Sequence, residues 1–96
     1  MTQPAKDNVI SAIKTAIGLF SNVEPEDVGQ NDHLVDDLYL ELGRDLPKVF
    51  AQIEKELDLS LEPDTISDFI TQAGEDPDKA TVFELIQLIS EEVEYN

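Results

Sequence analysis

Apolar residues recur at three- and four-residue steps in four stretches of the chain, and the strict alternation typical of strands is absent. Such steps place the apolar side chains on one face of an amphipathic helix. The four sets are Val9, Ile10, Ile13, Ala16, Ile17 and Phe20; Leu46, Val49, Phe50, Ile53 and Leu57; Ile66, Phe69 and Ile70; and Val82, Leu85, Ile86, Ile89 and Val93. The pattern predicts an all-α fold, a four-helix bundle of three longer helices and one short third helix.

Capping residues mark where these helices should begin. Asp7 is a plausible N-cap for the first helix, and Asp45 for the second, where Pro47 is tolerated in the first turn. Thr81 followed three residues later by Glu84 has the spacing of a capping box for the last helix. Residues 1–6 are expected to be a loose lead, and 7–96 a single helical domain.

A long segment, residues 23–37, separates the first two helices and contains Pro25, Gly29 and many acids. It is expected to be an ordered loop, because a long loop in a small domain needs anchors in the core. Five apolar residues are candidates for those anchors: Val23, Val28, Leu34, Val35 and Leu38.

The composition limits the classes of partner. The 96 residues include 22 Asp or Glu and 6 Lys or Arg, for a net charge of −16, while 41% of the chain is apolar. That apolar content predicts a folded domain, and the charge disfavours nucleic acid and anionic membrane as partners. Repulsion between copies favours a monomer. The chain lacks cysteine, a signal-peptide pattern and an apolar stretch of about 20 residues, so a cytoplasmic location is expected.

Catalytic and metal chemistry are weakly represented. His33 is the only side chain that ordinarily titrates near neutral pH, and a lone loop histidine is usually a surface residue. Asp76 and Asp78 have the spacing of the first two ligands of a calcium-binding loop, but Ala80 and Gln87 occupy two later ligand positions. Neither an enzyme nor a metal site is expected.

Several motifs resemble those of the acyl carrier protein family. The runs V-E-P-E-D-V at 23–28 and L-V-D-D-L at 34–38 are similar to the family's long first loop. The run I-E-K-E-L-D at 53–58 resembles the end of the family's second helix, and Thr81-Val82 the start of its last. The resemblance implies a small acyl-carrier-like bundle with a long first loop.

The family's functional residue is missing from this chain. Acyl carrier proteins bear a phosphopantetheine arm on a serine where the second helix begins, and that position falls at Leu42 or Gly43 here. The chain has no Ser or Thr between Asn22 and Leu59, where Tyr39 is the only hydroxyl. Because a phosphoester needs an oxygen nucleophile, we expect no phosphopantetheine and no other cofactor.

The resemblance also implies a partner-binding surface on the second helix, which in the family is acidic and docks on basic patches of enzymes. The positions carried over have mixed charge: Arg44, Asp45, Lys48, Glu54, Lys55 and Glu56. This mixture is compatible with ordinary solubility, and equally with an altered choice of partner.

The segment before that helix is bulky, whereas the family usually has small residues there. Tyr39, Leu40 and Leu42 either fold inward and close the cavity that shelters acyl chains, or form an exposed docking spot. Inward packing is favoured for the segment, and Tyr39 and Leu40 complete the candidate partner-binding set.

The leading hypothesis is a non-catalytic binding or regulatory module with the acyl-carrier fold and a protein partner, such as an enzyme of fatty acid, polyketide or other secondary-metabolite synthesis. The alternative is a genuine carrier that is modified at another residue or binds its ligand non-covalently. An acidic inhibitor or nucleic-acid mimic, and an accidental four-helix pattern, are two further possibilities.

Overall fold

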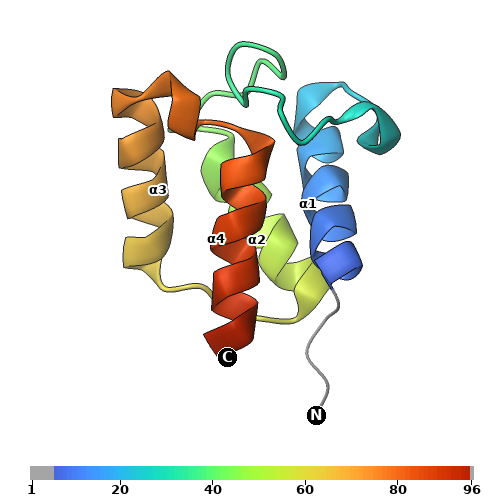
Figure 1. Cartoon of the computed structure of the whole chain (residues 1–96), viewed down its shortest axis with the longest axis vertical. Helices are drawn as coiled ribbons and strands as arrows, with labels where there is room; N and C mark the ends of the chain where they lie inside the picture. Colours follow the sequence, from blue (N-terminus) through green and yellow to red (C-terminus); the bar gives the residue numbers. More distant parts are fainter. Residues whose placement is uncertain (1–5, 96) are drawn as a thin grey trace.

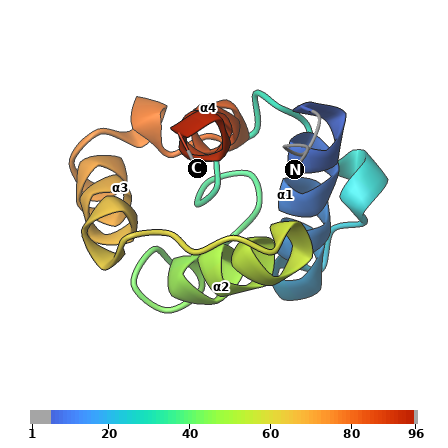
Figure 2. The ribbon, with the colours of Figure 1, turned by 90° about the horizontal axis from the view of Figure 1, so that it is seen from below.

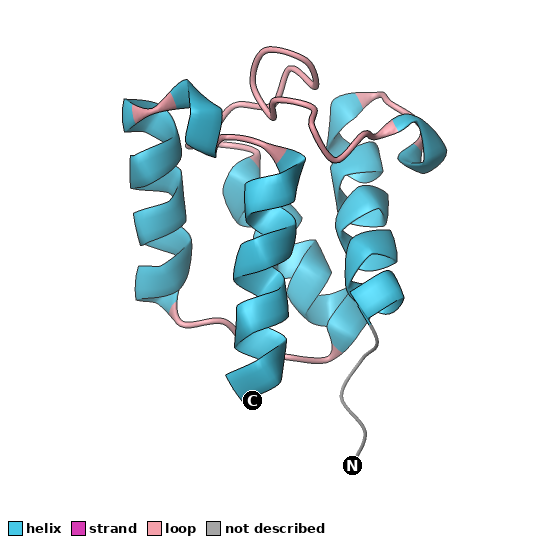
Figure 3. Cartoon of the chain, viewed as in Figure 1, coloured by secondary structure: helices cyan, strands magenta, loops and turns pink. Residues whose placement is uncertain are grey.

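The structure, a computed structural model, describes the backbone of residues 6–95 and the side chains of residues 8–93. It contains four α-helices, α1 (Lys6–Ser21), α2 (Leu46–Leu57), α3 (Pro63–Glu75) and α4 (Val82–Tyr95). Two short 3₁₀ helices, η1 (Pro25–Asp27) and η2 (Pro77–Lys79), follow α1 and α3. Figure 3 shows only helices and loops over the described part of the chain, which confirms the predicted all-α class. Residues 1–5 of the predicted lead lie outside the described residues.

The four helices surround one core. Figure 1 shows α3, α4 and α1 from left to right with α2 behind α4, and Figure 2 shows the same helices from below as a ring. Helix α1 packs against α2 and α4, whereas α3 packs against α2 and η2 and lies farther from α4. One side of the bundle, between α3 and α4, is therefore less tightly closed than the rest.

The apolar stripes predicted from the sequence form the core. Every predicted residue of α4 and four of the five in α2 are buried, and Leu57 is half-buried against them. In α1 the stripe holds from Val9 to Ile17, but Phe20 is 37% exposed, so its predicted burial is wrong. The α3 stripe is half-buried, and its Phe69 ring meets the Phe50 ring edge to face at a centroid distance of 5.6 Å.

The prediction that the third helix is short is wrong. Helix α3 has 13 residues, against 12 in α2. It continues past Ile70 because Ala73 is buried and gives another turn of the helix something to pack against. The helix ends where the Asp76 N–H donates to the carbonyl of Gln72, just before Pro77.

Helix starts follow the predicted caps only in part. The Thr81 hydroxyl accepts a hydrogen bond from the Glu84 N–H at 3.2 Å, as its spacing predicted. Asp45 occupies the N-cap position of α2, but its carboxylate makes no capping hydrogen bond to the helix, so the predicted side-chain cap is wrong. Helix α1 already includes Lys6, which places Asp7 inside the helix; the Asp7 side chain lies outside the described residues.

The long first loop, residues 22–45, is held by its apolar anchors and by the start of α4. Val28, Leu34 and Leu38 are buried and Val23 is half-buried, whereas Val35 is 40% exposed and is not an anchor. The Leu34 N–H donates to the carbonyl of Ala80 at 2.7 Å.

Two N–H groups at the start of α4 return hydrogen bonds to this loop. The Val82 N–H donates to the carbonyl of Asp32 at 3.0 Å, and the Phe83 N–H donates to the carbonyl of Gln30 at 2.8 Å. The first N–H groups of a helix have no partner inside it, so the loop supplies acceptors that α4 needs. This exchange places the loop across one end of the bundle.

Candidate functional site

Among the described residues, the large apolar side chains that are exposed to solvent lie at one end of the bundle. We call it the loop end; it is the upper end in Figure 1, where the long loop, the last turn of α1 and the first turn of α4 meet. The exposed residues are Leu19, Phe20, Val35, Tyr39 and Phe83. These exposed apolar side chains make the loop end the candidate surface for contact with a partner.

Tyr39 is the most exposed of these residues, at 80% of its surface, and its backbone is unusual. Its φ is 59°, in the left-handed region that costs a side chain with a Cβ about 1–2 kcal/mol. Two hydrogen bonds hold this conformation: the Tyr39 N–H donates to Val35 at 3.1 Å, and the Leu40 N–H to Leu34 at 2.9 Å. The loop therefore directs the tyrosine ring outward while it returns the next residue to the core.

Leu40 and Leu42 differ from Tyr39. Leu40 is 1% exposed and belongs to the core, so its assignment to a partner-binding surface is wrong. Leu42 is half-buried. The expected inward packing thus holds for Leu40, holds in part for Leu42 and fails for Tyr39, because the left-handed residue reverses the direction of the chain.

The turn between Leu40 and α2 is closed by Asp45. Its Oδ2 accepts a hydrogen bond from the Glu41 N–H at 3.0 Å, and its Oδ1 lies 3.3 Å from Arg44 Nε. The Glu41 N–H and then the Arg44 guanidinium hold the pKa of Asp45 below its usual value. Asp45 is buried, and its role in this turn explains its presence without contact to a partner protein. Arg44, beside it, is exposed.

The two positions that the resemblance assigns to a serine lie in the same turn. A Cβ built on Gly43 would meet no atom within 4 Å, so this position faces open space. Helix α2 begins three residues later, at Leu46. A side chain at position 43 would be accessible to an enzyme, yet this chain has no hydroxyl at 42 or 43.

The remaining candidates lie on α2. Lys48, Lys55 and Glu56 are exposed, and Glu56 accepts a hydrogen bond from Gln52 at 2.9 Å. Glu54 is half-buried, and its carboxylate accepts a hydrogen bond from the Leu61 N–H at 2.8 Å. The exposed residues remain available to a partner, whereas Glu54 is engaged within the chain.

A cavity of about 200 Å³ lies between the long loop, the turn before α2 and the end of α3. Its lining is mainly apolar or small: Val35, Leu42, Ala73, Gly74, Pro77 and Ala80, with His33 and Asp36 as polar members. His33 Nδ1 lies 3.3 Å from Asp37 Oδ2, and the His33 N–H donates to the same oxygen at 2.8 Å. The hydrogen bond from the His33 backbone N–H is the main reason that the pKa of Asp37 is lowered.

Sequence reasoning missed Leu19 and Phe83 as exposed candidates. Both are large apolar residues that fall outside the apolar stripe of their helix. Their position in the sequence relative to that stripe could therefore have predicted that they are exposed. The wall contributed by residues 73–80 was not predicted, because the cavity forms only when the end of α3 meets the long loop.

Across the described residues, no group of three or more His, Cys, Asp or Glu is arranged to hold a metal ion. In that same part of the chain, no helix is both long and apolar enough to cross a membrane. Comparison of the chain with protein-family models, curated proteins and solved structures gave no significant match. Its function is therefore inferred from its own residues and geometry.

Proposed function

We propose that this chain is a non-catalytic binding module on an acyl-carrier-like scaffold, and that it contacts a protein partner through its loop end without a phosphopantetheine arm. The observation that carries the proposal is the turn before α2, which is open to solvent at Gly43 and has no hydroxyl there. Beside this turn the chain instead displays Tyr39, 80% exposed and held at positive φ.

The order of elements supports the acyl-carrier-like reading. A long loop anchored by Val28 and Leu34 precedes α2, and Thr81 caps the last helix, as the resemblance implies. Two features depart from the family pattern: the length of α3, and the start of α2 at Leu46. The motifs before and after this turn place the family serine at Leu42 and at Gly43, one residue apart, and the later start of α2 leaves room for an insertion of that size.

Charge supports a partner that differs from those of ordinary carriers. Arg44, Lys48 and Lys55 are exposed where the family would present a mainly acidic surface. Reversing the sign of charges on a docking surface repels the partners that an acidic helix attracts. Proteins near enzymes of lipid or secondary-metabolite synthesis remain the class that the resemblance implies.

The test is intact mass spectrometry after co-expression with a broad-specificity phosphopantetheinyl transferase, with serine restored in matched variants. The parent chain should keep its unmodified mass, and Gly43→Ser or Leu42→Ser should gain the mass of phosphopantetheine. A gain in the parent would overturn the absence of the arm. If both serine variants fail, the acidic surface is restored in them with Lys48→Glu/Lys55→Glu, which removes the charge repulsion of the transferase. Failure of these variants too, with circular dichroism showing them folded, would overturn the acyl-carrier-like scaffold.

The second candidate function is non-covalent ligand binding, which the cavity of about 200 Å³ beside Leu42 favours. A neutral acyl-pantetheine would serve as the probe, because its apolar chain fits an apolar lining and its lack of charge avoids repulsion by the acidic chain. Binding that Ala73→Phe abolishes in a folded variant would support this function. Unchanged binding to that variant would exclude the cavity as the site.

A further inference from the structure

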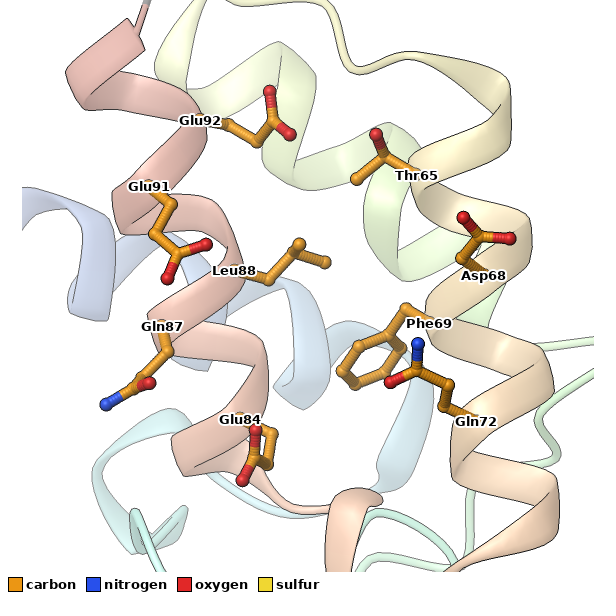
Figure 4. Close-up of a pocket in the computed structure, with 9 residues that line it drawn as sticks. All are labelled: Thr65, Asp68, Phe69, Gln72, Glu84, Gln87, Leu88, Glu91 and Glu92. Carbon is orange, nitrogen blue, oxygen red and sulfur yellow. The ribbon is translucent and has the colours of Figure 1, made fainter.

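A second candidate surface lies between α3 and α4 and includes no residue of the turn before α2. It is a groove of about 330 Å³, drawn in Figure 4. Its lining residues come from one stripe of each helix: Thr65, Asp68, Phe69 and Gln72 on α3, and Glu84, Gln87, Leu88, Glu91 and Glu92 on α4. These stripes each span about two helical turns.

The groove has an apolar middle and acidic walls. Phe69 and Leu88 point toward one another across it in Figure 4, and both are half-buried against the core. Carboxylates stand on both walls: Asp68 on α3, and Glu84, Glu91 and Glu92 on α4. A ligand in the groove would meet apolar surface between negative charges.

The charge on these two helices has one sign. Helix α3 carries three carboxylates and α4 four, and neither has a Lys or Arg. Three of the chain's six bases, Arg44, Lys48 and Lys55, lie instead on or beside α2. The acidity around the groove is therefore not balanced by bases on its own walls. A second copy of this chain, with a net charge of −16, would be repelled as it approaches.

We propose that the groove between α3 and α4 binds a basic amphipathic helix of a partner protein. An apolar side chain of that helix would pack on Phe69 and Leu88, and Lys or Arg one turn away on either side would approach the carboxylates. Two antiparallel helices already form the walls, so a third helix can lie along them with its apolar stripe inward. The inference goes beyond the proposed function, because it uses a different face and does not depend on the acyl-carrier resemblance.

The test uses a fluorescein-labelled synthetic peptide with Leu on one helical face and Lys on the other, titrated in about 0.1 M salt, where surface attraction is screened beyond about 10 Å. The groove variant Asp68→Asn/Glu91→Gln changes one exposed acid on each wall. The control Glu24→Gln/Glu26→Gln removes the same charge from exposed positions at η1, beside α1 and away from the groove.

We expect fluorescence anisotropy to show binding about tenfold weaker for the groove variant and less than about twofold weaker for the control, since only the groove charges lie close to the peptide. In the parent, amide shifts in NMR spectra should concentrate on the lining residues. A peptide with every Leu replaced by Ser should lose binding.

Three outcomes would overturn the proposal. The first is that both variants bind the peptide equally more weakly than the parent. The second is that the Ser peptide, or spermine as a cation without apolar side chains, binds the parent as tightly as the Leu peptide. The third is that the Leu peptide does not bind at all. The first two would reduce the groove to general attraction of cations by an acidic protein.

Discussion

The carboxylate of Glu54 on α2 accepts a hydrogen bond from the backbone N–H of Leu61 at 2.8 Å, seven residues later in the chain. Leu61 is 7% exposed, so without this acceptor its N–H would lie near the core and lose the hydrogen bond that it donates to Glu54. The bond ties the segment between α2 and α3 to α2. Glu54 was predicted to contact a partner, and the structure gives it this internal role.

Replacing Glu54 by Ala should lower the free energy of unfolding by about 1–2 kcal/mol, the cost of losing a charge-assisted hydrogen bond to a nearly buried donor. Urea denaturation followed by circular dichroism measures the change. Glu56→Ala is the control, because Glu56 is exposed and lies two residues further along the same helix. It should change the free energy of unfolding by less than about 0.5 kcal/mol. Equal effects of the two variants would contradict the structural role of Glu54.

Leu40 and Leu42 should respond differently to truncation. Leu40→Ala should cost about 2–5 kcal/mol, because the side chain is fully buried and its removal leaves a cavity. Leu42→Ala should cost only about 1 kcal/mol, because Leu42 is half-buried at the edge of an existing cavity. Urea denaturation of both variants tests the contrast, and a larger loss for Leu42 would show that the wrong leucine has been placed in the core.

Tyr39→Gly should stabilise the chain by roughly 0.5–1 kcal/mol. Glycine adopts positive φ without steric cost, and that gain exceeds the added freedom of the unfolded chain. Tyr39→Ala keeps a Cβ and loses only an exposed ring, so its thermal unfolding should match the parent within about 0.5 kcal/mol. If the glycine variant were the less stable of the two, Tyr39 would not be strained.

Acid should remove the stabilisation that Asp37 and Asp45 provide. Backbone N–H groups of His33 and Glu41 hold the pKa of these carboxyls below the ordinary value of about 3.9. Their contribution is therefore present above that pH and is lost as the pH falls through the lowered pKa of the folded state.

The comparison that isolates this effect is the parent chain against Asp37→Asn/Asp45→Asn, because protonation of the other acids changes repulsion in both. The parent should have the higher urea midpoint at pH 6, and the difference should shrink below about pH 4. A difference that stays constant to the lowest pH would show that these carboxylates act through packing alone.

The helical class and most of the core could be predicted because they depend on local spacing. The stripe through Val82, Ile86 and Ile89 is buried as expected, and Thr81 caps its helix. Phe20 has the right spacing but lies at the end of α1, where the core no longer covers it. The length of α3 was underestimated because the burial of Ala73 depends on distant parts of the chain.

The sequence by itself determined the number of helices, their apolar faces and the absence of a hydroxyl at 42 and 43, since periodicity and chemical identity are local properties. Only the tertiary structure decided that Tyr39 points outward, that Glu54 and Asp45 serve the backbone, and that a groove opens between α3 and α4. Each of these depends on hydrogen bonds or packing between segments that spacing along the chain does not relate, and these contacts form only when the helices assemble.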